Sequence, residues 1–226
     1  MSKYRIVITD FILDDLAPER RILGAIGDIA ACNVNDESEL GGRIDDADAV
    51  MMYHCITISK RTIERLSKCK LIVRCGVGYD NVDYVYARSR GIDVANVPDY
   101  GTEEVADSAI GLTLALTRGI HLLNSRLKES KGPWMYTQAS PVHRLRGRVF
   151  GVIGLGRIGT AAALRAKALG MDVVFFDPYK PDGYDKACGI RRVETLEELL
   201  AQCFVVSVHC PRTPETTHLI NAKTIA

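Results

Sequence analysis

The feature of this sequence that most constrains its fold is a glycine-rich turn between an apolar run and a helical pattern. The stretch VFGVIGLGRIG places Gly154, Gly156 and Gly159 directly after a predicted strand, residues 149–153, and at the start of a predicted helix, about residues 157–169. The first glycine permits a tight turn, the second lets a pyrophosphate approach the backbone, and the third lets the helix pack closely. Because free amides at the helix start would then face the phosphates, the motif predicts a dinucleotide site.

An acidic residue follows at the spacing that such a site requires. Asp177 ends the next predicted strand, residues 172–176, where a carboxylate can accept hydrogen bonds from the adenosine ribose hydroxyls. Since this carboxylate would repel a 2′-phosphate, the sequence favours NAD over NADP. Two alternatives stay open: a glycine turn without a ligand, and a 2′-phosphate bound by Lys180, Arg191 and Arg192.

Strand and helix patterns alternate from the N-terminus, which predicts parallel strands joined by right-handed crossovers. Residues 1–98 are therefore expected to form a doubly wound α/β domain, with helical spacing in APERRILGAI and SKRTIERLSK. The apolar runs of strand length in this part are Ile6–Ile8, Ala30–Val34, Ala49–Tyr53, Leu71–Val73 and Val94–Val97.

Residues 99–226 are expected to form a second α/β domain. It begins with a connecting helix at about residues 102–128, which we predict to be capped by Thr102 and buried between packed layers. After the glycine turn, further elements are expected at 195–201 (helix) and 204–208 (strand). Because a doubly wound sheet rarely ends after three strands, this domain is expected to be incomplete and the chain part of a longer one.

Composition disfavours several classes of partner. Lys and Arg number 29 against 28 Asp and Glu, and a formal charge of +1 is too small for the positive field that nucleic-acid binding requires. No run of about 18 apolar residues and no secretory segment is present, so a cytoplasmic protein without a membrane partner is expected. The seven cysteines are scattered and the histidines do not cluster, which predicts reduced thiols and no metal site.

The segment VHCPRTPETTHLIN supplies polar groups after the last predicted strand. Its prolines, hydroxyls and His209 are expected at the carboxyl end of the sheet, beside the cofactor crevice. A loop that ends in a helix cap is the alternative interpretation. His121 and His218 are interpreted as structural.

Several segments together resemble the D-isomer-specific 2-hydroxyacid dehydrogenase family. VRCGVGYDNVD, NVPDYGTEEVADSAIGL, LRGRVFGVIGLGRIG, FFDPY and VHCPRTPETTHLIN occur in the family's order and spacing. MMYHCITISKRTIERL is most similar to the branch that contains the C-terminal-binding-protein corepressors. The resemblance implies a flavodoxin-like substrate domain and a Rossmann NAD-binding domain. Between them a pyruvate-like 2-keto acid would bind, with hydride passing between the nicotinamide and C2.

The resemblance also implies roles for individual residues. One loop would lie against the nicotinamide and the substrate carboxylate, with glycine amides as donors: Arg74, Cys75, Gly76, Val77 and Gly78. Arg74 would bind the carboxylate, unless its role is purely structural, and Cys75 would be a small buried filler. The cofactor contacts would be made by Thr102, Gly154, Gly156, Arg157, Ile158, Gly159, Asp177, His209, Cys210, Pro211 and Thr216.

The family resemblance further implies a homodimer through the segment 129–147, which carries Trp134. The family's catalytic arginine, glutamate and histidine are expected beyond Ala226, so residues 1–226 alone are expected to be inactive. Two functions follow. One is an NAD-dependent dehydrogenase of a D-2-hydroxy acid, whose identity is left open. The other is an NAD(H)-gated dimerising protein of the corepressor kind.

Overall fold

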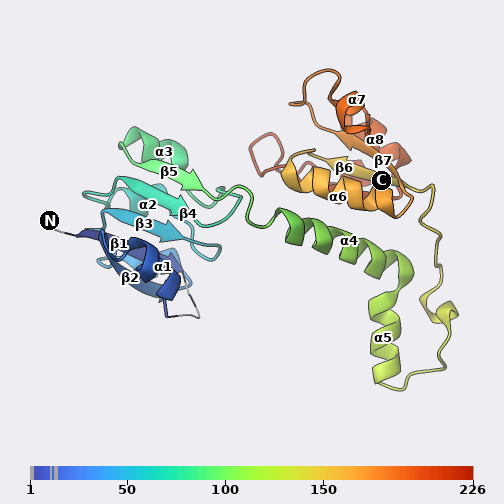
Figure 1. The fold of residues 1–226 in the computed structure, drawn as a ribbon, viewed down its shortest axis with the longest axis horizontal. Helices are drawn as coiled ribbons and strands as arrows, with labels where there is room; N and C mark the ends of the chain where they lie inside the picture. The colour runs from blue at the N-terminus through green and yellow to red at the C-terminus, as the bar shows by residue number, and fades with distance from the viewer. Residues whose placement is uncertain (1–2, 11, 13–14, 226) are drawn as a thin grey trace. The chain divides into compact units, whose positions relative to one another are not determined.

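The computed structural model describes residues 3–10, 12 and 15–225. The chain folds into two compact units, Met1–Tyr100 and Gly101–Ala226, each built on a parallel β-sheet with helices (Figure 1). The predicted α/β class with two parallel sheets is confirmed. The boundary lies close to the position expected from the sequence, after residue 98.

The first unit contains a five-stranded sheet in the order β2-β1-β3-β4-β5, and every neighbouring pair is parallel. This strand order is the flavodoxin-like one, in which the direction of winding reverses between β1 and β3. Its elements are β1 (Tyr4–Asp10), α1 (Ala17–Leu23), β2 (Gly27–Val34), the 3₁₀ helix η1 (Glu37–Leu40), β3 (Ala49–Met52), α2 (Lys60–Ile63), β4 (Leu71–Arg74), α3 (Tyr84–Ser89) and β5 (Asp93–Asn96).

The core of the first unit follows the two-residue period of its strands. Val7, Val50 and Ile72 lie on one face of the sheet and are buried together with Leu40 and Ile63 from the covering elements. Of the helical pattern predicted over SKRTIERLSK, only the short α2 is helical, and a turn follows it at residues 64–65.

The second unit contains a four-stranded parallel sheet in the order β8-β7-β6-β9. Its strands β6 and β7 have the bounds that the sequence predicts. Its elements are α4 (Thr102–Arg118), α5 (Ile120–Lys128), the 3₁₀ helix η2 (Tyr136–Ala139), β6 (Val149–Ile153), α6 (Arg157–Ala168), β7 (Asp172–Phe176), α7 (Tyr184–Cys188), β8 (Arg191–Arg192), α8 (Leu196–Gln202), β9 (Val205–Val208) and α9 (Ala222–Ile225).

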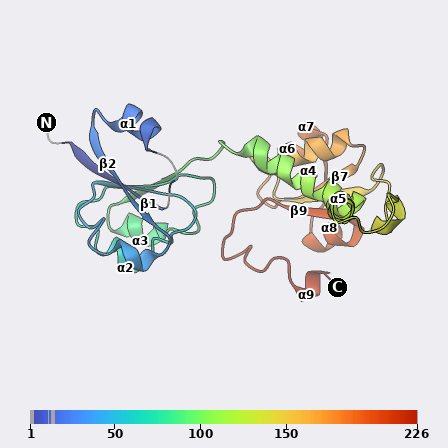
Figure 2. The same ribbon diagram turned by 90° about the horizontal axis from the view of Figure 1, so that it is seen from below.

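Helices cover both faces of this second sheet (Figure 2). Phe150 of β6 and Phe175 of β7 pack with Ala163 of α6 on one face. Ile153 and Leu199 pack on the other, where α8 lies. Because the side chains of a strand alternate, β6 and β7 each contribute to two cores and carry almost continuous apolar sequences.

The long helix expected over residues 102–128 is interrupted. Gly119 adopts the left-handed conformation with φ of 63° and separates α4 from α5, and a Cβ there would lie 2.4 Å from Cβ of Ala139. The expected cap is also wrong, since Gly101 occupies the N-cap position and Thr102 is the first helical residue without a side-chain capping bond.

The expectation that this helix is buried between layers is corrected as well. Ala106 and Thr113 are the buried residues of α4, whereas Leu112 and Leu116 are exposed. The reason is that α4 packs through one small-residue face on α6, where Ala106 meets Ala161 and Ala162. Within the described residues, no helix combines the length and apolar character needed to cross a membrane.

Candidate functional site

The glycine turn after β6 has a conformation that only glycine adopts easily. Gly154 has φ of 88°, and a Cβ atom there would lie 2.7 Å from the backbone nitrogen of Cys210. A Cβ on Gly159 would lie 2.1 Å from the carbonyl oxygen of Gly154, so α6 packs directly against the turn. At Gly156, by contrast, a Cβ would meet nothing within 4 Å. The second glycine therefore borders open space.

The first turn of α6 presents free backbone donors beside this open space. Gly156 is the N-cap of α6, and no side chain caps the helix. In the described part of the chain, the amides of Arg157, Ile158 and Gly159 have no hydrogen-bond acceptor. Three unpaired N–H groups at the start of a helix of 12 residues form a site that attracts an anionic group.

Asp177, the residue after β7, closes this arrangement from the neighbouring strand. Its carboxylate accepts hydrogen bonds from the backbone nitrogens of Leu155, at 2.9 Å, and Tyr179, at 3.0 Å. The residue is 9% exposed. Since each carboxylate oxygen has two lone pairs, each can accept one further hydrogen bond. The glycine turn thus fixes a buried acidic group whose acceptor capacity is only partly used.

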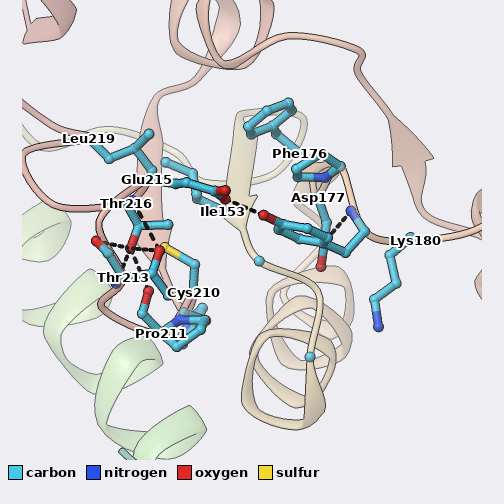
Figure 3. A pocket seen from close by; sticks show the side chains of 15 residues that line it. Ile153, Phe176, Asp177, Lys180, Cys210, Pro211, Thr213, Glu215, Thr216 and Leu219 are labelled. Atoms are coloured by element: carbon cyan, nitrogen blue, oxygen red, sulfur yellow. Dashed lines mark hydrogen bonds between the residues drawn. The ribbon is translucent and has the colours of Figure 1, made fainter. Parts of the chain in front are cut away.

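These groups border a pocket of about 550 Å³ at the carboxyl ends of β6, β7 and β9 (Figure 3). Its walls come from the glycine turn, the residues that follow β7 and the loop after β9. The lining residues are Ile153, Gly154, Gly156, Phe176, Asp177, Pro178, Tyr179, Lys180, His209, Cys210, Pro211, Thr213, Glu215, Thr216 and Leu219. Apolar, hydroxyl and carboxylate groups therefore share one cavity, as a nucleoside requires.

The loop after β9 is held in place by its own polar groups. Thr216 Oγ1 donates to the carbonyl oxygen of Pro211 at 2.6 Å and accepts from the Thr213 nitrogen at 2.8 Å. The His209 nitrogen donates to the Ile153 carbonyl at 2.8 Å, which attaches the loop to β6. Burial raises the pKa of the Cys210 thiol, which keeps it protonated. The loop is thus a rigid pocket wall.

His209 lies at the base of this loop. Burial lowers the pKa of His209, and its Nε2 lies 2.8 Å from Oγ of Ser207. A half-buried imidazole bonded to a neighbouring hydroxyl is suited to shape the pocket.

One interaction joins the two walls of the pocket. The hydroxyl of Tyr179, which follows β7, donates to the carboxylate of Glu215 in the loop after β9 (Figure 3). The hydrogen bond to Glu215, together with the negative charge of that carboxylate, raises the pKa of Tyr179. The pocket therefore carries a second carboxylate besides Asp177.

Seven of the lining residues are among those predicted as cofactor contacts. The other eight were not: Ile153, Phe176, Pro178, Tyr179, Glu215 and Leu219, together with Lys180, named only for a 2′-phosphate, and Thr213, expected at this edge as one of the loop's hydroxyls. Their common signal is position, since each ends a strand or belongs to a segment that follows one, at the carboxyl edge of a parallel sheet. The side chains of Arg157 and Ile158, also predicted as cofactor contacts, are not among the lining residues. Buried Gly159 lies under the turn.

Thr102 lies at the start of α4, also outside the lining residues. Its hydroxyl oxygen is buried, and it has no hydrogen-bond partner within the described residues. An unpaired buried hydroxyl is costly, so the group fits a ligand contact better than a purely structural role.

The three cations considered for a 2′-phosphate do not converge. Lys180 lines the pocket, with Nζ 4.7 Å from the centre of the Tyr184 ring. Arg192 donates to the Lys180 carbonyl and pairs with two acidic side chains, while Arg191 donates to Gln202. Lys180 is the one of these three that reaches the pocket, where two carboxylates oppose an added phosphate.

The loop predicted to contact substrate follows β4 in the first unit. Nη2 of Arg74 lies 2.7 Å from Nδ1 of His54, and Arg74 is 8% exposed. The Gly76 amide, one of the expected donors, instead donates to the Arg74 carbonyl at 2.8 Å. The amides of Val77 and Gly78 have no acceptor in the described ranges. The loop thus combines a buried guanidinium with two available amides.

Two further observations bear on predicted groups. Burial raises the pKa of the half-buried Cys75 thiol, which donates to the Val73 carbonyl at 3.9 Å. In residues 3–10, 12 and 15–225, no three His, Cys, Asp or Glu side chains lie together as metal ligands would.

The glycine turn, the free amides of α6 and the acidic residue after β7 define a dinucleotide-binding domain of the doubly wound α/β class. Residues 110–226, more than half of the chain, match the family model described as D-isomer specific 2-hydroxyacid dehydrogenase, NAD binding domain. The chain belongs to this family, and the cofactor of this domain is NAD.

The chain is similar both to a protein named as a dehydrogenase and to one named as a C-terminal-binding protein. The chain is 35% identical over 222 residues to D-3-phosphoglycerate dehydrogenase of Methanocaldococcus jannaschii, covering 98% of this chain and 41% of that protein. It is 34% identical over 216 residues to C-terminal-binding protein 1 of Caenorhabditis elegans, covering 93% of this chain and 30% of that one. The chain thus spans less than half the length of these relatives.

Solved structures show the same arrangement of strands and helices. D-lactate dehydrogenase from Aquifex aeolicus, in complex with NAD and lactic acid, matches with a TM-score of 0.85 and 26% identity. The match covers 97% of this chain and 64% of that one.

Proposed function

We propose that the full protein transfers a hydride between a nicotinamide cofactor and C2 of a D-2-hydroxy acid or the corresponding 2-keto acid. The observation that carries the proposal is that two sheet edges of one chain have opposite chemistry. The second unit presents a glycine turn and the acidic Asp177, whereas the first presents the buried cation Arg74 beside two free amides. A dinucleotide and a small carboxylate are the ligands that fit these two edges.

The residues of the second unit fit NAD in three ways. The free amides at the start of α6 would bind the pyrophosphate, and Gly156 would leave room for it. Asp177 would accept hydrogen bonds from the adenosine ribose with its remaining lone pairs. The apolar wall formed by Ile153, Phe176 and Leu219 would contact the adenine. When bound, the nicotinamide ring supplies the hydride or accepts it.

The carboxylates in the pocket also provide cofactor selectivity. Asp177 and Glu215 would both repel a 2′-phosphate, and Lys180 is the single ammonium or guanidinium group among the lining residues. We therefore propose that the protein uses NAD in preference to NADP.

The first unit would bind the substrate through its carboxylate. The guanidinium of Arg74 and the amides of Val77 and Gly78 are the donors, and a guanidinium matches a carboxylate in charge and geometry. The general acid/base is assigned, as the family resemblance implies, to a histidine outside residues 1–226. His209 is not assigned this role, because it lines the pocket of the second unit, where its Nε2 is bonded to the hydroxyl of Ser207.

The test is an assay of NADH oxidation by the full-length protein with pyruvate, glyoxylate, hydroxypyruvate, phosphohydroxypyruvate and bulkier 2-keto acids. Turnover that favours NADH over NADPH and depends on Arg74 is expected. Tight NADH binding without turnover of any of these acids would overturn the dehydrogenase proposal.

A second candidate function is an NAD(H)-gated dimerising protein of the corepressor kind. The exposed apolar side chains in the segment 129–147 favour it, because Trp134 is 84% exposed and Tyr136 is 70% exposed. Such residues fit an interface with a second copy of the chain. Analytical ultracentrifugation with and without NADH tests this candidate, which requires that the cofactor shift the protein towards the dimer. Both functions are consistent with a cytoplasmic protein.

A further inference from the structure

Arg74 and His54 lie at the carboxyl edge of the first sheet, at the ends of the adjacent strands β4 and β3. Arg74 is the last residue of β4 and pairs in register with Met52, the last residue of β3. His54 follows two residues after Met52. Because the two strands are parallel, their carboxyl ends place both side chains at the same edge of the sheet, where doubly wound folds bind ligands.

The backbone around His54 is fixed by side chains from two other segments. The buried carboxylate of Asp10, at the end of β1, accepts hydrogen bonds from the Cys55 nitrogen at 2.8 Å and the Ile56 nitrogen at 3.3 Å. Nδ2 of Asn81 donates to the carbonyl oxygens of Tyr53 and Ile56, at 3.2 and 2.8 Å. The imidazole therefore projects from a rigid support.

The contact between the two side chains fixes the state of the imidazole. A guanidinium only donates, so Nδ1 of His54 must accept the hydrogen bond from Nη2 of Arg74. The contact therefore requires the tautomer of His54 that carries its proton on Nε2. A protonated imidazole could not make this contact.

The guanidinium has unused capacity that points to an anion. In the described residues Arg74 forms no ion pair, and its buried Nε has no hydrogen-bond partner. Nη1 lies over Gly76, where a Cβ would approach it to 1.4 Å, so a side chain at this position would displace the guanidinium. Beyond Gly76 come the free amides of Val77 and Gly78. A buried cation without an acidic partner is costly unless a ligand supplies one.

We propose that His54 is a positioning residue, which holds the Arg74 guanidinium over Gly76 so that Nη1 and the two amides receive a substrate carboxylate together. The inference rests on the proposed function, in which Arg74 binds the carboxylate of a 2-keto acid. His54 acts through Arg74 and touches neither cofactor nor reacting atoms in this role.

The test compares two variants of nearly equal size in the full-length protein. Asparagine can place a carbonyl oxygen close to the position of Nδ1, whereas leucine cannot accept a hydrogen bond. His54→Leu is expected to raise the KM for the 2-keto acid and the Kd for oxamate, a non-reducible analogue, by roughly tenfold, with the Kd for NADH unchanged. His54→Asn is expected to restore both constants to within about threefold.

Arg74→Met separates this inference from the proposed function. If Arg74→Met weakens oxamate binding and His54→Leu does not, the positioning role is overturned and the carboxylate site stands. If neither variant weakens oxamate binding, both the positioning role of His54 and the carboxylate site are overturned. Equal losses of oxamate binding in His54→Leu and His54→Asn would also overturn the positioning role, because the hydrogen-bond acceptor at residue 54 would then be irrelevant. The double variant, with both His54→Leu and Arg74→Met, is expected to bind oxamate no more weakly than Arg74→Met alone, since His54 acts only through Arg74.

Discussion

Both sheets of the molecule are parallel, but their carboxyl edges have opposite chemistry. In the second unit the edge is a pocket with a glycine turn, apolar walls and the carboxylates of Asp177 and Glu215. In the first unit the edge presents a buried guanidinium, that of Arg74, held by His54. Parallel sheets thus supply a location for ligands, whereas the few side chains that follow each strand select the ligand's charge.

The largest expected effect comes from filling the glycine turn. Gly154→Ala should abolish NADH binding. It should also reduce the free energy of unfolding by more than the roughly 1–3 kcal/mol that a strained φ alone costs, because the added Cβ would also collide with Cys210. Gly183→Ala is the matched control, since Gly183 has φ of 81° and a Cβ there would meet nothing within 4 Å. Calorimetric NADH titration and urea unfolding measure both effects. Equal losses in the two variants would show that backbone strain alone is responsible.

Removing the acidic group separates the two edges. Asp177→Ala should weaken the binding of NADH roughly tenfold, through loss of hydrogen bonds to a charged acceptor. The binding of NADPH should be weakened by less. The KM for the 2-keto acid should stay unchanged, whereas Arg74→Met should raise that KM and leave the Kd for NADH unchanged. Fluorescence titration and initial-rate kinetics give both constants. If either variant moves both constants equally, the two edges do not bind separate ligands.

A smaller effect is expected at the second carboxylate of the pocket. Glu215→Gln removes a negative charge from the exposed pocket wall and should narrow the preference for NADH over NADPH by about threefold, because screening weakens exposed charges. Glu197→Gln, at an exposed position of α8, is the control and should change neither affinity. If the ratio of the affinities for NADH and NADPH is unchanged in Glu215→Gln, this residue does not contribute to cofactor selectivity.

The smallest effect concerns pH and the base of the pocket. Burial lowers the pKa of His209, so the unfolded chain binds a proton there more readily than the folded one. Stability from this group is present above the unfolded value of about 6.5 and is lost as the pH falls below it. His209→Gln should therefore flatten the decline in unfolding free energy between about pH 7.5 and 5.5, and His121→Gln, in an exposed position, should not. Urea unfolding across this range decides the matter.

Most strands and helices of the fold could be predicted from the sequence, because the signals that mark them are local. The bounds of β6 and β7 follow from apolar runs that end at a glycine turn and at Asp177. By contrast, α7 and β8 were not predicted, since β8 is a two-residue edge strand, Arg191–Arg192, without apolar residues. The interruption at Gly119 was missed because it depends on contact with a distant residue, Ala139.

The candidate sites divide in the same way. Spacing alone placed the three glycines and Asp177 at one edge, because each occupies a fixed position relative to a strand. The contact between Arg74 and His54 joins residues 20 positions apart, and no periodic pattern reports it. The bond between Tyr179 and Glu215 likewise depends on the path of a loop that hydroxyl groups fix.

The most direct test is a crystal structure of the full-length protein with NADH and oxamate. We expect the adenosine ribose within hydrogen-bond distance of Asp177, the pyrophosphate at the start of α6, and the oxamate carboxylate on Arg74 and the amides of Val77 and Gly78. A ribose bound away from Asp177, or an oxamate carboxylate bound away from Arg74, would contradict the assignment of opposite charges to the two edges.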